Sequence, residues 1–466
     1  MSDFKFLIGG KLVAGAQTMD VINPATGRAL TQSPRASHAQ LDEAVAAAKT
    51  AFTSWARTPL AERAKVLLAI ADTIEANITE LARLLTQEQG KPLADATSEL
   101  GGAQRMFRYF ATLDLPVHAD NSQGKKIELH RKPLGVVAAI VPWNFPVAMV
   151  ASKLAPALLA GNTVVLKPAA TTPLTTLRLG ELLKDVLPAG VLNVVADAND
   201  LGGVLTSHAD IRKISFTGST ATGIKVMAGA ASNLKRITLE LGGNDAAIVL
   251  DDVDPKEVAQ KIYNSAFRNS GQICIAVKRL YVQEGVYDAV CEELAKLAKA
   301  TVVGDGLDAA TKMGPLQNRA QYEKVKQIIE DSRQHGKVIA GGDTPAGDGY
   351  FISPTIVRDI TDGTRLVDEE QFGPVLPIIK FSDPQDAVNR ANASSYGLGG
   401  SIWSSNPERA YALAVQIESG SVWINKHADL SPGIPFGGAK QSGFGTEYGQ
   451  EGLNEFTQLQ VVNIAV

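Results

Sequence analysis

Three short apolar runs in the first half of the chain most strongly limit what it can fold into. They are Val136 to Val141, Thr163 to Leu166 and Leu192 to Val195, and helical stretches separate them. Strands that are buried on both faces have such runs, whereas strands with one wet face alternate polar and apolar residues. The sequence therefore predicts an open α/β sheet of parallel strands, with a ligand-binding cleft at their carboxyl ends.

A second alternation of strands and helices begins after Gly243. It predicts a helix that ends at Phe267 and strands at 246–250, 277–282, 337–339, 355–356 and 375–381. A chain of 466 residues is long enough for two or three domains. We therefore assign residues 1–119 with 136–242 to one α/β domain and residues 243–441 to a second one.

Two amphipathic helices are expected before the first apolar run. Ser37 is the predicted N-cap of the first helix, and the second helix runs from about Leu60 to Gln87. The predicted buried stripe of the first helix consists of residues at helical spacing, namely Ala44, Val45, Ala48, Phe52 and Trp55.

Two further segments, residues 120–135 and 458–466, alternate like strands but have no evident partner in either domain. Exposed strand edges of this kind promote association unless something covers them. We expect these segments to form a small β arm.

Composition excludes several classes of function. The net charge is −4 and no basic cluster occurs, so the chain has no electrostatic footprint for nucleic acid or an anionic membrane. No apolar run approaches the roughly 20 residues that span a bilayer, and the N-terminus does not resemble a signal peptide. Two cysteines form no useful disulfide framework. We expect a cytoplasmic protein that acts on small molecules, and we assign no metal site.

One of these cysteines has the features of a nucleophile. Gly271 and Gln272 interrupt the helical pattern just before Cys274, so the thiol is expected on a turn that faces a cleft. A thiol with an unperturbed pKa of about 8.5 is mostly protonated at neutral pH and needs a base. Glu240 is the candidate base. Cys291 lies at helical spacing with apolar neighbours, and packing explains it.

The segments around these two residues resemble signatures of the NAD(P)-dependent aldehyde dehydrogenases of the non-acylating, hydrolytic type. Further matching runs follow the family's order over nearly the whole chain: Val141-Pro142-Trp143-Asn144-Phe145-Pro146, Leu166-Lys167-Pro168, Phe216-Thr217-Gly218-Ser219-Thr220, Glu369-Glu370-Gln371-Phe372-Gly373-Pro374 and Pro435-Phe436-Gly437-Gly438. The resemblance implies a Rossmann-like cofactor-binding domain (1–119 and 136–242), a catalytic domain (243–441) and an oligomerisation arm (120–135 and 458–466) of a homodimer or homotetramer.

The resemblance also implies a mechanism for oxidising an aldehyde to a carboxylic acid. Cys274 attacks the aldehyde, and the Asn144 amide with the Cys274 backbone N–H stabilises the resulting oxyanion. Glu240 activates the water that hydrolyses the thioester. Lys153 and Glu447 match a proton-exit pair of the family, and a surface ion pair is the alternative for them.

The expected cofactor is NAD or NADP. Gly218 to Gly223 follow an apolar stretch and open a helix, whose N-terminus suits a diphosphate. With the family's contacts carried over, the cofactor residues are Ile140, Pro142, Trp143, Lys167, Ala170, Phe216, Gly218, Ser219, Thr222, Leu241, Gly242, Glu370 and Phe372.

Two departures from the family leave the choice of cofactor open. Many NAD-preferring members have a glutamate where this chain has Ala170, and without it nothing at that position repels a 2′-phosphate. Lys167 remains to attract that phosphate, so we expect use of both cofactors. Ala196-Asp197 replaces the family's Pro-Gly, so the adenine pocket is expected to differ.

The residues that match the family's aldehyde tunnel are mostly apolar: Phe145, Met149, Ser152, Ile273, Ile275, Leu430 and Phe436. Succinate-semialdehyde dehydrogenases have an arginine where this chain has Ser152, and a second arginine that matches Arg268. Burying a substrate carboxylate with one of two donors missing costs about 1 to 3 kcal/mol. We therefore favour uncharged medium-chain aliphatic or aromatic aldehydes, with a semialdehyde as the alternative.

Two other functions are compatible with such a fold. A CoA-acylating dehydrogenase transfers its thioester to a thiol rather than to water, but such relatives usually lack a base at the position of Glu240. A binding protein without activity is the other alternative, because a fold does not dictate function. The joint presence of Cys274, Glu240 and Asn144 argues against it.

Overall fold

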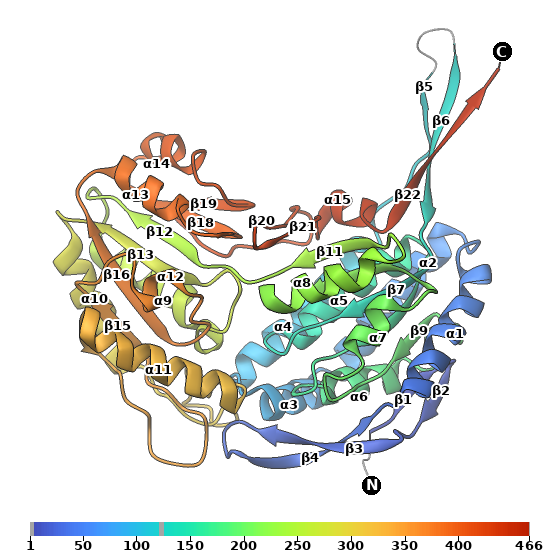
Figure 1. The fold of residues 1–466 in the computed structure, drawn as a ribbon, viewed down its shortest axis with the longest axis horizontal. Helices are drawn as coiled ribbons and strands as arrows, with labels where there is room; N and C mark the ends of the chain where they lie inside the picture. Colours follow the sequence, from blue (N-terminus) through green and yellow to red (C-terminus); the bar gives the residue numbers. More distant parts are fainter. Residues whose placement is uncertain (1–3, 121–124, 466) are drawn as a thin grey trace.

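An eight-stranded sheet forms the centre of the lobe that contains the first half of the chain (Figure 1). The computed structural model describes residues 4–120 and 125–465. Its first sheet runs in the order β2 (Lys11–Val13), β1 (Phe6–Ile8), β9 (Leu192–Val194), β8 (Thr163–Lys167), β7 (Val136–Ile140), β10 (Ile211–Thr217), β11 (Arg236–Glu240) and β21 (Gly443–Phe444).

The three apolar runs form β7, β8 and β9, which are parallel and fully buried, so this prediction is confirmed. From β7, the chain builds β8 and β9 on one side and then β10 and β11 on the other. The direction of building therefore reverses between β7 and β10. In open α/β sheets, ligands bind beyond the carboxyl ends of the strands at such a reversal.

Eight helices pack around this sheet: α1 (His38–Trp55), α2 (Leu60–Ala76), α3 (Ile78–Gln89), α4 (Leu93–Phe110), α5 (Pro146–Leu159), α6 (Leu174–Leu182), α7 (Gly202–Ser207) and α8 (Thr220–Ala231). Ser37 is the N-cap of α1, as predicted. Its side chain accepts from the Gln40 backbone N–H, and the Gln40 side chain accepts from the Ser37 N–H. In the predicted buried stripe, only Phe52 is half-buried rather than buried.

The predicted single helix from Leu60 to Gln87 is wrong, because the chain breaks there into α2 and α3. Asn77 separates the two helices and has a non-helical φ of −115° and ψ of 16°. Its Nδ2 donates to the carbonyl oxygen of Thr73 at 2.8 Å. Asparagine side chains compete with the backbone for such hydrogen bonds, which favours the end of a helix over its interior.

A seven-stranded sheet forms the second lobe, and it is parallel except for β14. Its order is β14 (Lys337–Ala340), β15 (Thr355–Arg358), β16 (Val375–Phe381), β13 (Val277–Gln283), β12 (Asp245–Val249), β18 (Gly399–Trp403) and β19 (Ser421–Ile424). The predicted strands of this region are confirmed. The helices around it are α9 (Pro255–Phe267), α10 (Tyr287–Ala300), α11 (Arg319–His335), α12 (Arg365–Asp368), α13 (Pro384–Asn392) and α14 (Pro407–Ala414).

The two lobes meet where the chain passes between them. It leaves the first lobe after Glu240, and it returns after β19 to form β21, which pairs antiparallel with β11 through Leu239 and Phe444. Three small elements complete the lobes: the hairpin β3 (Gln17–Asn23) and β4 (Arg28–Arg35), the pair β17 (Tyr396–Gly397) and β20 (Ala439–Lys440), and α15 (Gly449–Asn454).

A three-stranded sheet projects from the first lobe (Figure 1). Its strands are β22 (Thr457–Ile464), β6 (Lys126–Pro133) and β5 (His118–Asp120). Residues 121–124 and 466 of the expected arm lie outside the described residues. In β22, Leu459, Val461 and Val462 are exposed by 44%, 57% and 37%, so this edge presents apolar surface.

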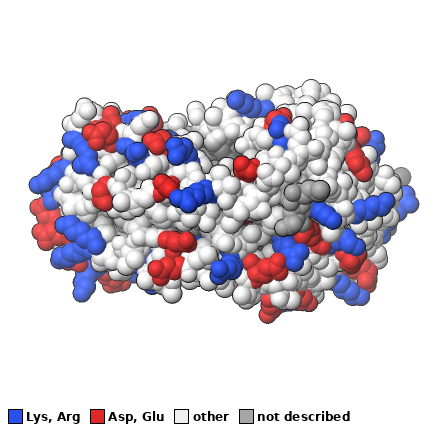
Figure 2. Space-filling view, turned by 90° about the horizontal axis from the view of Figure 1, so that it is seen from below, with Lys and Arg blue, Asp and Glu red and all other residues white. Residues whose placement is uncertain are grey.

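Acidic and basic side chains are interspersed over the face that Figure 2 shows. Within residues 4–120 and 125–465, no helix is long and apolar enough to cross a membrane.

Candidate active site

Cys274 follows a left-handed turn between α9 and β13. Asn269, Ser270 and Gly271 have φ angles of 50°, 56° and 72°. This region is unfavourable for residues with a Cβ, and asparagine and glycine tolerate it best. A Cβ on Gly271 would also collide with the carbonyl oxygen of Gly373. The predicted turn is therefore present, and it has a backbone that few sequences can adopt.

Three buried side chains hold this turn. Lys278 Nζ donates to the carbonyl oxygen of Cys274 at 2.5 Å, and His427 Nε2 donates to that of Ile275 at 2.9 Å. From the first lobe, Asn144 Nδ2 donates to the carbonyl oxygen of Gln272 at 3.0 Å. Hydrogen bonds from both lobes thus fix the backbone on either side of the sulfur.

The turn faces a cleft of about 230 Å³ between the lobes. The rings of Trp143 and Phe372 pack edge to face in the wall of this cleft, with centroids 5.3 Å apart. The structure brings together in its lining twelve residues singled out from the sequence: Pro142, Trp143, Asn144, Phe145, Met149, Gly218, Ser219, Leu241, Gly242, Cys274, Glu370 and Phe372.

Other expected site residues do not line this cleft. Ser152 is 1% exposed and its hydroxyl donates to the carbonyl oxygen of Met149, one turn back in α5. Ile275 and Phe436 are also buried, Ile273 is half-buried, and Leu430 is exposed. Of the expected cofactor residues, those outside the lining are Ile140, Lys167, Ala170, Phe216 and Thr222.

Sequence reasoning missed three residues of the lining, Thr217, Gln321 and Lys324. Thr217 ends β10 next to Gly218. Its position at the carboxyl end of a strand could have identified it, because ligands bind at such ends. Gln321 and Lys324 belong to α11, which no motif marks. Their side chains donate to the carbonyl oxygens of Phe372 and Glu370 at 2.9 and 2.7 Å, so α11 supports the loop that completes the cleft.

Lys153 and Glu447 form a buried ion pair, with 2.7 Å between Nζ and Oε1 and side chains exposed by 0% and 4%. Lys153 Nζ also donates to the Thr217 hydroxyl at 2.7 Å. The alternative of a surface ion pair is therefore wrong. Burying two charges costs several kcal/mol in desolvation. The pair lies beside the cleft, because Thr217 is one of its lining residues.

Glu240 ends β11 and is 3% exposed. Its Oε1 has no hydrogen-bond partner among the described residues. Burial, and next the negative charge of Glu447, raise the pKa of Glu240 well above its ordinary value. Burial, and next Glu240, also raise the pKa of the Cys274 thiol, while the Lys278 ammonium lowers it. Burial and Glu240 both favour the protonated thiol over a standing thiolate.

Glu370 is held close to the turn that bears Cys274. Its Oε1 accepts from the Gly243 backbone N–H at 3.1 Å and lies 3.2 Å from Lys278 Nζ. Since Lys278 also contacts the Cys274 carbonyl, one ammonium group joins the catalytic turn to a carboxylate on the cleft wall.

Lys167 is not free to attract an anion, contrary to the expectation from the sequence. It ends β8 and forms a buried ion pair with Asp197, which follows the adjacent strand β9. Asp197 Oδ2 also accepts from the Leu201 backbone N–H at 2.8 Å. Asp197, which departs from the family pattern, thus neutralises the charge of Lys167.

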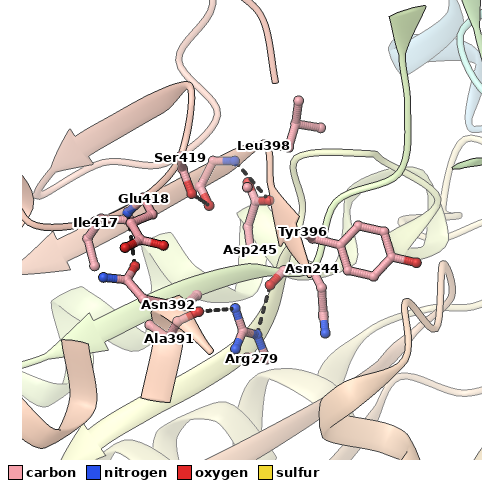
Figure 3. A pocket seen from close by; sticks show the side chains of 13 residues that line it. Asn244, Asp245, Arg279, Ala391, Asn392, Tyr396, Leu398, Ile417, Glu418 and Ser419 are labelled. Atoms are coloured by element: carbon pink, nitrogen blue, oxygen red, sulfur yellow. Dashed lines mark hydrogen bonds between the residues drawn. The ribbon is translucent and has the colours of Figure 1, made fainter. Parts of the chain in front are cut away.

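A second cavity lies in the second lobe beside Asp245, Arg279 and Glu418 (Figure 3). Its volume of about 10 Å³ has room for roughly one water molecule. It is too small for an aldehyde and does not reach Cys274, so we place the substrate in the cleft of about 230 Å³ that Cys274 lines.

Comparison with known proteins agrees with this geometry. The model of the aldehyde dehydrogenase family matches residues 12–462. The chain is 42% identical to phenylacetaldehyde dehydrogenase of Pseudomonas fluorescens, over 99% of this chain and 96% of that protein. It is 39% identical to mitochondrial succinate-semialdehyde dehydrogenase of Arabidopsis thaliana, over 98% and 88%.

Among solved structures, betaine aldehyde dehydrogenase of Staphylococcus aureus in complex with NAD+ has a TM-score of 0.96 and 33% identity, over 99% of this chain and 95% of that one. The chain belongs to the aldehyde dehydrogenase family. It is an NAD(P)-dependent oxidoreductase with the Rossmann-like and catalytic parts of that fold, as the sequence predicted.

The electrostatics of the turn predict how the Cys274 thiol titrates. Because its pKa is raised, alkylation of Cys274 by iodoacetamide should increase about tenfold per pH unit through neutral pH and level off only above the range of an ordinary thiol. Lys278→Met removes the cation that lowers this pKa, so alkylation at pH 8 should be slower still. Lys278→Arg keeps the charge and serves as the control, with Cys291→Ala as the background. Equal rates in the Met and Arg variants would contradict the electrostatic effect of Lys278.

Proposed function

We propose that the protein oxidises an aldehyde to its carboxylic acid through a thioester on Cys274 that water hydrolyses. The observation that carries this proposal is the arrangement of Cys274 and Asn144 on one cleft, with Glu240 close enough to raise the pKa of the thiol. The proposed parts are a cofactor-binding domain (1–119 and 136–242), a catalytic domain (243–441) and an oligomerisation arm (120–135 and 458–466).

In the first half-reaction, the Cys274 sulfur attacks the aldehyde carbon and the thiol proton passes to Glu240, the candidate base. The aldehyde oxygen becomes an oxyanion. An amide group has two N–H donors, and Asn144 uses one of them on the Gln272 carbonyl, so the other is available for the oxyanion. A preorganised donor of this kind contributes about 3 to 4 kcal/mol to the transition state.

In the second half-reaction, Glu240 activates water to attack the thioester. Its raised pKa favours uptake of the proton from that water. We assign the exit of that proton to Glu447 and Lys153, whose buried ion pair acts electrostatically on Glu240. A CoA-acylating enzyme needs no such base, so the buried carboxylate favours hydrolysis.

NAD or NADP fits the site. Ser219 is the N-cap of α8, which follows β10 at the point where the strand order of the first sheet reverses. The backbone N–H groups at the start of this helix suit a diphosphate. Glu370 offers carboxylate oxygens to a ribose, and Phe372 packs against Trp143 on the cleft wall. A nicotinamide held by these residues would supply the hydride acceptor for the carbon attached to Cys274. The NAD+ complex of the Staphylococcus relative supports this assignment.

The proposed substrate is an uncharged medium-chain aliphatic or aromatic aldehyde. Phe145, Met149 and Trp143 present apolar surface beside Cys274, and the similarity to a phenylacetaldehyde dehydrogenase supports the choice. Arg268 lies outside the lining, with its guanidinium 3.9 Å from Asp95 and half-exposed. A semialdehyde remains the alternative, because Arg268 also lies 6.0 Å from the ring of Phe145 and a succinate-semialdehyde dehydrogenase is among the relatives.

We further propose that the exposed edge of β22 pairs with another copy of the chain, in a homodimer or homotetramer. A cytoplasmic location stays a prediction from the sequence.

Replacing the base tests the proposed hydrolysis. Glu240→Gln should accumulate acyl-enzyme, seen as a rapid burst of NAD(P)H followed by a steady state slower by about a hundredfold or more. Cys274→Ala should abolish both phases, whereas Cys291→Ala, a buried packing residue, should leave both nearly intact. A steady-state rate in Glu240→Gln that equals the wild-type rate would refute the role of the base.

The pairing of Lys167 with Asp197 predicts a preference for NAD. Asp197→Ala frees the lysine for a 2′-phosphate, and Ala170→Glu adds a repelling carboxylate. Each change should shift the ratio of the NADP and NAD dissociation constants about tenfold, in opposite directions, for an interaction of roughly 1 to 2 kcal/mol in a partly wet site. Both constants are measured by titration in the Cys274→Ala background, which does not turn over. An unchanged ratio in Asp197→Ala would mean that the pairing of Lys167 with Asp197 does not control binding of the 2′-phosphate.

The apolar wall predicts a preference for longer aldehydes. Each methylene that reaches the wall contributes up to about 0.8 kcal/mol, so kcat/KM should increase from acetaldehyde to hexanal. Met149→Ala should lower kcat/KM for hexanal several-fold while it changes the value for acetaldehyde little. If the wild-type protein turns over succinate semialdehyde far better than hexanal, the alternative substrate replaces the proposed one.

A further inference from the structure

We infer that the buried ion pair between Lys91 and Glu99 positions Asn144 and thereby sets the rate of the first half-reaction. The inference rests on the proposed role of Asn144 as oxyanion donor. Neither Lys91 nor Glu99 lines the cleft, so both are positioning residues rather than catalytic ones.

The start of α5, directly after Asn144, has no cap of its own. Its N-cap residue, Phe145, forms no side-chain hydrogen bond, and the first helical residue is Pro146. Glu99 of α4 supplies the missing acceptor, because its Oε1 accepts from the backbone N–H groups of Val147 at 2.9 Å and Ala148 at 3.1 Å. A carboxylate there also suits the positive end of the helix dipole.

Lys91 holds the other end of the same turn. Its Nζ donates to Glu99 Oε2 at 2.5 Å and to the carbonyl oxygen of Asn144 at 2.9 Å. The same ammonium lies 3.9 Å from the centroid of the Phe145 ring. Both charged side chains are fully buried, so one ion pair fixes the backbone on both sides of Phe145.

The Asn144 carbonyl oxygen joins this ion pair to the catalytic turn. It accepts from Lys91 in the first lobe and from Asn269 Nδ2 in the second at 3.0 Å. With its carbonyl held from both lobes, the Asn144 side chain has little freedom to move relative to the Cys274 sulfur. A donor that stabilises a developing oxyanion is effective only when it is positioned before the reaction.

A merely stabilising role explains this ion pair poorly. Replacing a buried ion pair by apolar residues of similar volume is often neutral or stabilising. After Glu99, the charges that act most on Lys91 are those of Asp95 and Arg268. Glu99 is therefore its direct counter-charge, and it is the group whose loss should release the Asn144 turn.

The test is a double-mutant cycle. Glu99→Gln keeps the shape of the side chain and removes its charge, and it should slow the single-turnover formation of NAD(P)H about tenfold. The dissociation constant of the cofactor should change less than about twofold, since Glu99 does not line the cleft. In an Asn144→Ala background, Glu99→Gln should have no further effect, because it acts through Asn144.

Glu88 provides a matched control. It is another buried glutamate that caps a helix of the same lobe, with Oε2 and Oε1 accepting from the backbone N–H groups of Leu174 at 2.7 Å and Thr175 at 2.9 Å. Glu88→Gln should lower the melting temperature because it weakens a buried helix cap, yet it should leave the single-turnover rate unchanged. Equal rate losses in the two variants would overturn the inference.

Other outcomes are equally decisive. If Glu99→Gln slows the reaction by the same factor with and without Asn144, the ion pair does not act through that residue. If Asn144→Ala alone leaves the single-turnover rate unchanged, the proposed function of Asn144 fails rather than its positioning. If Glu99→Gln does not fold, Lys91→Met replaces it in the same cycle. Lys91→Met removes the donor to the Asn144 carbonyl but keeps the hydrogen bonds by which Glu99 caps α5.

Discussion

The reciprocal hydrogen bonds between Asn144 and the turn before Cys274 are the interaction on which the rest of the site depends. Asn144 donates to the Gln272 carbonyl, and Asn269 donates back to the Asn144 carbonyl. One residue comes from each lobe, so these bonds set the distance between the proposed nucleophile, Cys274, and the proposed oxyanion donor, Asn144. The left-handed backbone at 269–271 costs free energy, and the hydrogen bonds offset that cost in the folded protein.

Buried charge is the second principle of this site. Lys153 pairs with Glu447, Lys278 with Glu370 and Lys91 with Glu99, and each lysine donates to or lies beside a residue of the cleft. Glu240 stands apart, because one of its carboxylate oxygens has no partner among the described residues. A carboxylate left unsatisfied in a dry site has a raised pKa and is ready to take up a proton, which is what a general base requires.

Local sequence patterns predicted the helices and strands that carry the site. They did not predict the features that depend on contacts between distant parts of the chain. The apolar runs of β7, β8 and β9 were recognisable because strands buried on both faces have few polar positions. The break at Asn77 was missed, because helical periodicity continues across one non-helical residue. Ser152 was placed on the aldehyde tunnel by position alone, and its side chain turns back onto its own helix. Gln321 and Lys324 reach the cleft from a helix without any motif.

The sequence by itself determined the parallel sheets, the turn that bears Cys274 and the identity of the candidate nucleophile and base, because each depends on residues close together in the chain. Only the tertiary structure decided how the charges are paired. Lys167 meets Asp197 thirty residues later, and Lys91 reaches Asn144 from the loop between α3 and α4. The free energy of a charge depends on which groups surround it in space, so the pairings that bear on cofactor choice and on the oxyanion donor exist only once the chain has folded.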